Sequence, residues 1–193
     1  MAETKAEDTA QAGEPAETKP TRRRTPKRKV VEQHARSYFD AIGRRDAEGI
    51  GEHWREDCVD DIVPIGVLRG RQAIVGFFRE MFAAVPDLET TVKRLVAGEA
   101  SAAVEWRMRG HFTGAPFQGI DPTGKPIELR GVDLLEIEDG EIVSITAYYD
   151  GASFARQVGM LPPEGSGADR TMKSAFNAVT KVRKALADRT GGA

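Results

Sequence analysis

The sequence predicts an α+β fold, in which helices come first and a meander of long strands comes last. Two patterns support this prediction. In stretches between Val30 and residue 84, apolar residues recur at three- and four-residue steps, as they do on one face of a helix. In the second half of the chain, apolar and charged residues alternate, and the Asp139-Gly140 pair between two such runs is typical of a β-hairpin. We therefore expect helices packed on one face of an antiparallel sheet.

Three helices are expected before the main part of the sheet. The first runs from Val30 to a stop at residues 44–46, and its apolar face carries Val31, Ala35, Tyr38 and Ile42. A short second helix follows at about residues 47–54. The third, residues 72–84, is rich in large apolar side chains and ends before Pro86.

The strands are expected in five runs, separated by turns rich in glycine and proline. These runs are residues 58–65, 88–96, 102–109, 127–138 and 141–150. The run at 102–109 alternates most clearly, and residues 113–125 form the longest turn-rich stretch.

Charge divides the chain into three parts. The whole sequence holds 28 basic and 30 acidic residues and has a net charge of −2. Residues 1–29 hold 8 basic and 5 acidic groups, residues 30–163 hold 14 and 22, and residues 164–193 hold 6 and 3. We predict a disordered tail with a basic cluster, one acidic domain, and a flexible link leading to a basic amphipathic helix.

Both basic ends allow two interpretations. The N-terminal cluster is either a weak anchor for the phosphates of a polyanion or a solubilising tail. The C-terminal helix carries Met172, Phe176, Val179, Val182 and Leu186 on one stripe. That stripe docks either on the domain or a partner subunit, or on a membrane surface.

Several classes of protein and site are excluded by what the sequence lacks. No apolar run approaches the roughly 18–20 residues of a membrane helix, so no integral membrane contact is expected. The polar N-terminus is unlike a signal peptide, and the single cysteine, Cys58, suits a cytoplasmic protein. The three histidines have no metal-ligand spacing, so we expect neither a metal nor another cofactor.

Asp133 is the most informative residue for function. It shares the parity of Leu129, Leu135 and Ile137 in its strand, so its carboxyl group is directed at the apolar face. Burial of this kind raises the pKa of an aspartate and keeps it neutral near pH 7. Two structural alternatives remain: a buried aspartate satisfied by a nearby donor, or a bulge at Gly131 that turns the side chain outward.

Tyr38 and Asp61 are the other candidate catalytic residues. Tyr38 lies on the inner stripe of the first helix, where a tyrosine is either a core residue or a hydrogen-bond donor to a ligand. Asp61 is in register with Val59, Val63 and Ile65, which predicts an inward side chain, whereas Asp60 has the opposite parity. A carboxylate base beside a tyrosine and a neutral acid suits proton transfer next to a carbonyl group.

Four segments resemble SnoaL-like polyketide cyclases, and ketosteroid isomerases of the same nuclear transport factor 2-like superfamily are similar. The segments are residues 38–46, 54–57, 114–125 with its Pro-Thr-Gly-Lys turn, and 132–143 with its Asp-Gly hairpin. The resemblance covers about residues 30–163. It implies a cone-shaped, curved antiparallel sheet wrapped around three N-terminal helices, a deep pocket, and often a homodimer formed through the sheet.

The resemblance also implies roles for single residues. Tyr38 falls on the oxyanion tyrosine of the isomerases and Asp133 on their protonated aspartate. Their base position falls on Ile62 when counted without gaps, one residue from Asp61. The acid of the cyclases corresponds to Ala147 here, and a cyclase histidine corresponds to Phe112.

Two functional hypotheses follow from these residues. The first is an isomerase- or cyclase-type enzyme for a hydrophobic, carbonyl-containing ligand resembling a polyketide or a steroid. Asp61 would be the base, Tyr38 and Asp133 would stabilise the enolate, and the apolar wall would be formed by Trp54, Phe78, Trp106 and Tyr149. The second is a non-catalytic ligand-binding or dimerisation module, tethered by its basic ends to a polyanion or a protein partner.

Overall fold

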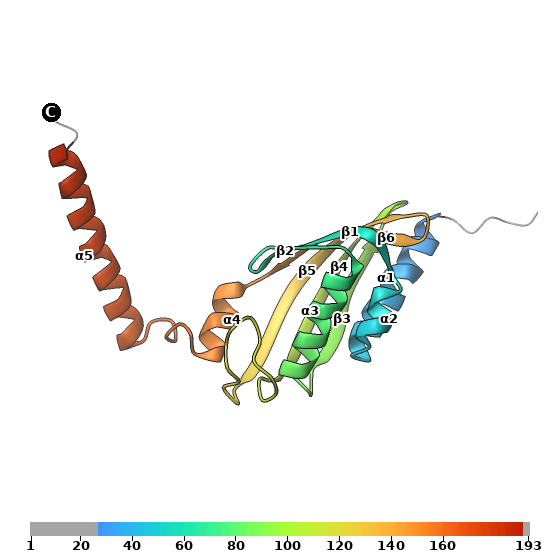
Figure 1. Cartoon of the computed structure of the whole chain (residues 1–193), viewed down its shortest axis with the longest axis horizontal. Coiled ribbons are helices and arrows are strands. Elements are labelled where there is room, and N and C mark those ends of the chain that lie inside the picture. Colours follow the sequence, from blue (N-terminus) through green and yellow to red (C-terminus); the bar gives the residue numbers. More distant parts are fainter. Residues whose placement is uncertain (1–26, 191–193) are drawn as a thin grey trace, which may run out of the picture.

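A computed structural model describes residues 27–190 of the chain and shows an α+β fold (Figure 1). The elements in chain order are α1 (Lys27–Gly43), α2 (Ala47–Gly51), β1 (Trp54–Ile62), β2 (Gly66–Arg69), α3 (Arg71–Ala84), β3 (Glu89–Ala97), β4 (Ser101–His111), β5 (Pro126–Glu138), β6 (Glu141–Tyr149), α4 (Gly151–Val158) and α5 (Gly167–Thr190). The predicted tail lies outside the described residues at positions 1–26. Residues 27–29 of its basic cluster instead open α1.

The six strands form one curved sheet in the order β2-β1-β6-β5-β4-β3. All neighbouring strands are antiparallel except β1 and β6, which run parallel with Asp60 opposite Ile145. The antiparallel sheet expected from the sequence is therefore confirmed, with this one parallel pair as an exception. Its members are separated by most of the domain, so local sequence patterns do not show that they pair.

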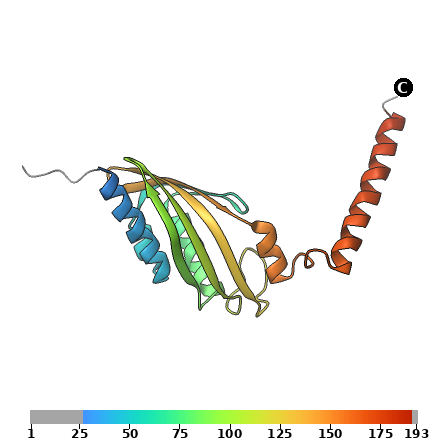
Figure 2. The ribbon, with the colours of Figure 1, turned by 180° about the vertical axis from the view of Figure 1, so that it is seen from behind.

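Helices α1, α2 and α3 lie on the concave face of the sheet. α1 contacts β3 and β4, and α3 contacts β1 and β2. In the view from behind, the strands pass in front of α3, so the sheet curves around the helices (Figure 2). The predicted stripe of α1 is buried, and Ile74, Val75 and Phe78 of α3 are buried opposite it. The space between the helices and the sheet is therefore where the core and any internal cavity lie.

Three local features differ from the prediction. The second helix ends at Gly51, because Trp54 already begins β1. The run expected at residues 58–65 ends as a strand at Ile62, where the chain turns and pairs back as β2, with Ile62 opposite Gly66. Helix α4 was not predicted. The turn at residues 63–65 matters most, because Val63 and Ile65 lie in it and not in β1, so they do not indicate which side chains of β1 face inward.

Helix α4 closes one end of the domain against β5. Its first turn is capped by Asp150, whose side chain accepts a hydrogen bond from Ser153 N at 2.9 Å, and it ends at Gly159 in a left-handed conformation. The Gln157 amide replaces a missing strand partner, since it accepts from Glu128 N at 2.6 Å and donates to Glu128 O at 2.9 Å. These bonds hold α4 over the part of β5 that lies beyond the end of β6.

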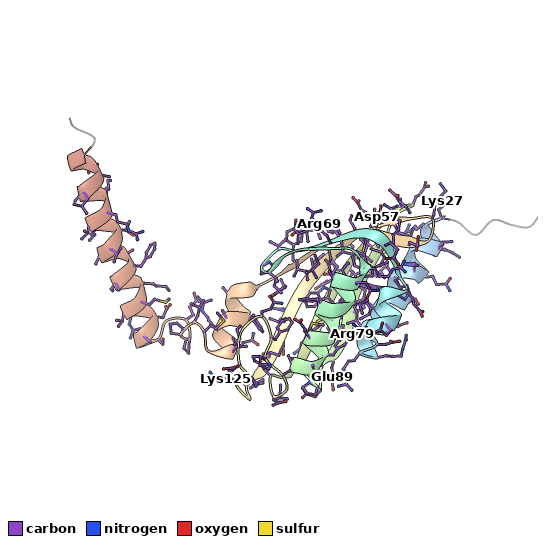
Figure 3. All side chains as sticks on the ribbon, viewed as in Figure 1. Lys27, Asp57, Arg69, Arg79, Glu89 and Lys125 are labelled. Atoms are coloured by element: carbon purple, nitrogen blue, oxygen red, sulfur yellow. The ribbon has the colours of Figure 1, made fainter. Side chains whose placement is uncertain are left out.

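Helix α5 confirms the predicted C-terminal amphipathic helix and projects away from the sheet (Figure 1). Within the described part of the chain, no helix is long and apolar enough to cross a membrane. Side chains project into the space between α3 and the strands, whereas labelled charged residues such as Arg69 and Arg79 lie on the outside (Figure 3). The acidic residues that face inward are therefore exceptions that need an explanation.

Candidate active site

A cavity lies between the concave face of the sheet and helices α1, α3 and α4. The empty space inside it, including open solvent at its mouth, is about 900 Å³. The wall combines aliphatic side chains with eight aromatic ones, and these are Tyr38, Phe77, Phe78, Trp106, Phe112, Phe117, Tyr149 and Phe154. Among residues 27–190, no Lys, Arg or His lines the cavity, whereas Asp60 and Asp133 both do. The cavity is thus apolar, with two carboxyl groups and no basic side chain in its lining.

Asp133 points into this cavity from the middle of β5. Its side chain is buried, and its Oδ1 accepts a hydrogen bond of 2.7 Å from Trp106 Nε1 on the neighbouring strand. Residue 131, which lies opposite Trp106, is a glycine, and a Cβ there would lie 2.3 Å from Cζ2 of the indole ring. The glycine therefore leaves room for the indole ring that donates to Asp133. No bulge at Gly131 turns the side chain of Asp133 outward.

The protonation of Asp133 is set by two opposing effects. Burial in an apolar environment raises its pKa and outweighs the hydrogen bond from Trp106, which lowers it, so that the pKa is about 7. The indole N–H stabilises the carboxylate more than the neutral acid, because a charged acceptor forms the stronger hydrogen bond. Asp133 is consequently balanced between its two protonation states near neutral pH.

Asp60 is the second carboxyl group in the cavity. Its side chain is only 3% exposed, and its buried Oδ1 has no hydrogen-bond partner among the described residues. Burial, and to a smaller extent the neighbouring carboxyl groups of Asp133 and Asp61, raise its pKa to about 8. Because no donor stabilises its charged form, Asp60 favours the neutral acid more strongly than Asp133 does.

The prediction that Asp61 faces inward is wrong. Asp61 is half-buried and does not line the cavity, whereas Cys58, Asp60 and Ile62 are the buried residues at this end of β1. The prediction took its parity from Val59, Val63 and Ile65. Val63 and Ile65 lie in the turn after β1, and Val63 is exposed. Cys58 and Ile62, at two-residue steps on either side of Asp60, were the signal that identifies the inward face.

Tyr38 reaches the cavity from the inner face of α1. It is buried, and burial raises its pKa well above the ordinary value, with the carboxyl groups of Asp60 and Asp133 adding to the rise. The Trp54 side chain has the opposite effect and lowers the pKa of Tyr38. The phenol therefore stays protonated at neutral pH and is available as a hydrogen-bond donor.

The four residues predicted to form the apolar wall have different outcomes. Phe78, Trp106 and Tyr149 line the cavity, and burial raises the pKa of Tyr149. Trp54 does not line it, so that prediction is wrong. Its ring lies edge-on to Tyr38 with centroids 6.0 Å apart, because it belongs to the start of β1 and not to a helix facing the cavity.

Some lining residues were not predicted as site residues. Phe154 belongs to the unpredicted helix α4, while Phe112 and Ala147 contribute a ring and a methyl group to the wall. Ala147 is the position that the resemblance assigned to a cyclase acid, so an apolar group takes that place here. Among residues 27–190, no group of three or more His, Cys, Asp or Glu side chains is arranged to hold a metal ion.

Comparison with known proteins agrees with this geometry. Residues 32–158 match the SnoaL-like polyketide cyclase family. AclR from Streptomyces galilaeus is 23% identical, with a TM-score of 0.63, and the alignment covers 84% of this chain and 98% of that one. A SnoaL-like protein from Jannaschia sp. CCS1 is 19% identical, with a TM-score of 0.65 and coverages of 74% and 100%.

IdmH from Streptomyces antibioticus is a third structural neighbour, 24% identical, with a TM-score of 0.58 and coverages of 67% and 98%. No curated protein matches the chain significantly. At these identities the structural neighbours show the fold, and the family match covers most of the domain that holds the cavity. The chain therefore belongs to the SnoaL-like polyketide cyclase family.

Proposed function

We propose that this protein is a metal-independent enzyme that moves a proton next to a carbonyl group of a neutral, hydrophobic ligand. The observation that carries the proposal is a pair of buried carboxyl groups, Asp60 and Asp133, with raised pKa values in one aromatic cavity. Buried acids of this kind are characteristic of acid–base sites, because they can exchange protons near neutral pH. Tyr38 supplies a third proton-bearing group in the same cavity.

The two carboxyl groups take different roles in this proposal. Asp133 is the base, because the hydrogen bond from Trp106 favours its charged form. Asp60 is the neutral acid, because its buried Oδ1 has no donor and a second negative charge beside Asp133 is unfavourable. This assignment replaces the roles expected from the sequence, where Asp61 was the base and Asp133 the neutral acid.

The proposed reaction begins when Asp133 removes a proton from the carbon next to the carbonyl group. The electron pair of the broken C–H bond moves into the carbonyl group and forms an enolate. Tyr38 and protonated Asp60 donate hydrogen bonds to the enolate oxygen, which stabilises it in a low-dielectric site. Protonated Asp133 then returns the proton to the same or a different carbon, and the second outcome is an isomerisation.

The cavity lining supports a neutral and hydrophobic ligand. Because none of the lining side chains is basic, a carboxylate or phosphate on the ligand would face two acidic residues with no compensating charge. The aromatic wall offers flat apolar surfaces to fused rings. A polyketide- or steroid-like compound with a single reactive carbonyl group fits these requirements.

Exchange of the α-proton of a polycyclic enone in D₂O tests this proposal by NMR. We expect exchange catalysed by the wild-type protein and slowed roughly 10²–10³-fold in Asp60→Ala, because a donor to the enolate is lost. Asp61→Ala is the matched control, because it removes the neighbouring carboxyl group outside the cavity. Equal rates for the two variants, or no exchange in the wild-type protein across a panel of enones, contradict the proposal.

A further inference from the structure

The side chains of the cavity that can form hydrogen bonds gather in one half of it. Trp106 and Tyr149 are both paired with Gly131 of β5, and Asp133 lies two residues further along that strand. Tyr38 reaches the same half from α1, since the carboxyl group of Asp133 is close enough to help raise its pKa. Four polar side chains from three strands and one helix therefore lie together.

Asp60 completes this polar half. Its strand partner, Ile145 of β6, pairs in turn with Leu135 of β5, so Asp60 lies beyond Asp133 along the sheet, on the side away from α4. Among the described residues that line the cavity, no other side chain carries an O–H, N–H or carboxyl group. A ligand oxygen can therefore find side-chain partners in the polar half alone.

The other half of the cavity lies around the first residues of β5, and we call it the distal half. Its side chains come from the end of α3, from the segment 112–125 and from α4, and they belong to an apolar cluster of their own, including Val85, Leu88, Phe112, Phe117, Ile127 and Phe154. The two helices that supply Tyr38 and Phe154, α1 and α4, lie at opposite ends of the sheet (Figure 1). Asp133 and Ile127 are six residues apart on one strand, which is roughly 20 Å along it. The cavity is therefore elongated, with its polar groups at one end.

Backbone groups around the distal half are already hydrogen-bonded to one another. Phe112 N donates to Lys125 O at 3.0 Å, and Phe112 O accepts from Gly124 N at 2.8 Å. Gly114 N donates to Ala84 O at 3.0 Å. A ligand hydroxyl group placed here would lose its hydrogen bonds to water without gaining a polar side chain or one of these N–H groups in exchange, which is unfavourable.

We propose that the ligand is an elongated ketone that carries its oxygen atoms at one end only. Its carbonyl end lies in the polar half, where Tyr38 and Asp60 supply the donors, and its hydrocarbon end fills the distal half as far as Ile127 and Phe154. Compounds with hydroxyl groups at the far end or spread along their rings are then rejected. This inference rests on the proposed function, because it takes the carbonyl group to be the part that the polar half binds.

Three ketones test the proposal by titration, followed by tryptophan fluorescence because Trp106 lies in the cavity wall. They are 1-tetralone, 6-hexyl-1-tetralone and 6-(5-hydroxypentyl)-1-tetralone. The two chains point away from the carbonyl group and have the same number of non-hydrogen atoms. We expect the hexyl compound to bind about 30-fold or more tightly than 1-tetralone, because each buried methylene group is worth up to about a three-fold gain. The terminal hydroxyl group is expected to weaken binding roughly 10–100-fold relative to the hexyl compound.

Two variants show where the hydrocarbon chain lies. Ile127→Phe enlarges a side chain of the distal half, and Leu129→Phe enlarges a half-buried lining side chain next to it. The advantage of the hexyl compound over 1-tetralone is expected to fall about ten-fold or more in each variant, because the added ring occupies the space of the chain. Ile137→Phe is the matched control, because Ile137 is buried on the same face of β5 but does not line the cavity. Circular dichroism and thermal unfolding check that all three variants are folded.

Several results overturn the proposal. Equal affinities for the hexyl and hydroxypentyl compounds mean that the end of the chain lies in solvent or finds a polar partner. An advantage of the hexyl compound that survives in both Ile127→Phe and Leu129→Phe places the chain outside the distal half. An equal loss in Ile137→Phe shows a general effect of crowding the core, and the absence of binding by the hexyl compound also contradicts the proposal.

Proton exchange in the same three ketones separates this inference from the proposed function. Exchange of the C2 protons, which lie next to the carbonyl group, is followed by NMR in D₂O. If the protein selects the hexyl compound but exchanges none of its C2 protons, the proposed reaction is wrong and the ligand class stands. If it exchanges the C2 protons of all three compounds with equal kcat/KM, the proposed reaction stands and this inference is wrong.

Discussion

Asp133→Asn is expected to lower turnover of a polycyclic enone by roughly 10²–10⁴-fold, the usual contribution of a positioned general base. The amide has nearly the shape of the carboxylate but cannot accept the proton. Glu136→Gln is the matched control, because Glu136 lies on the same strand and is exposed. Steady-state kinetics with both variants measures the effect. Equal loss of activity in the two variants contradicts a catalytic role for Asp133.

The pH dependence of the wild-type enzyme follows from the same assignment. Activity is expected to rise as Asp133 ionises near pH 7 and to fall as Asp60 loses its proton near pH 8. Trp106→Phe removes the donor that lowers the pKa of Asp133, so the rising limb is expected to move to higher pH. An unchanged limb in Trp106→Phe shows that this hydrogen bond does not control the base.

Folding stability is expected to fall as pH rises from about 4 to about 8. Asp60 and Asp133 have raised pKa values, so the folded state binds protons that the unfolded state has already released in this range. These groups contribute their full stability below the pKa that they have in the unfolded state. This contribution is lost as pH rises through the pKa that they have in the folded state. Each pKa unit corresponds to about 1.4 kcal/mol, which predicts a total loss of several kcal/mol.

Urea unfolding at pH 5, 7 and 9 measures this loss. Asp60→Asn is expected to flatten the dependence and to be more stable than the wild-type protein at pH 9, whereas Asp61→Asn keeps the wild-type slope. The ion-paired carboxyl groups of Asp57, Asp87 and Glu128 have lowered pKa values, so they affect stability in the acidic range below this window. A wild-type stability that is constant or rises between pH 5 and pH 9 contradicts buried neutral acids.

The sequence was sufficient to predict the fold and the position of Asp133, because both depend on regular periodicity. In β5, every second residue from Gly131 to Ile137 is buried, so parity along that strand is a reliable guide to side-chain direction. Tyr38 could be placed for the same reason, since α1 is a long amphipathic helix whose buried face follows one stripe. Long, uninterrupted elements make such predictions secure.

The rest of the site depends on features that periodicity does not contain. The turn after Ile62 made parity misleading for Asp60 and Asp61, and the early start of β1 removed Trp54 from the wall. The hydrogen bond from Trp106 to Asp133 joins residues 27 positions apart, so it emerges only once β4 and β5 are paired. Helix α4 was missed although Asp150 and Gly159 mark its two ends, as capping residues do.

Asp60 and Asp133 are both buried acids in this account, and the hydrogen bond from Trp106 makes Asp133 lose its proton at a lower pH than Asp60. NMR titration of the ¹³C-labelled carboxyl groups measures this directly, with Asp60→Asn and Asp133→Asn used to assign the signals. We predict pKa values of about 8 for Asp60 and about 7 for Asp133, with Asp133 ionising first. Titration of both groups near pH 4, or of Asp60 before Asp133, contradicts the account.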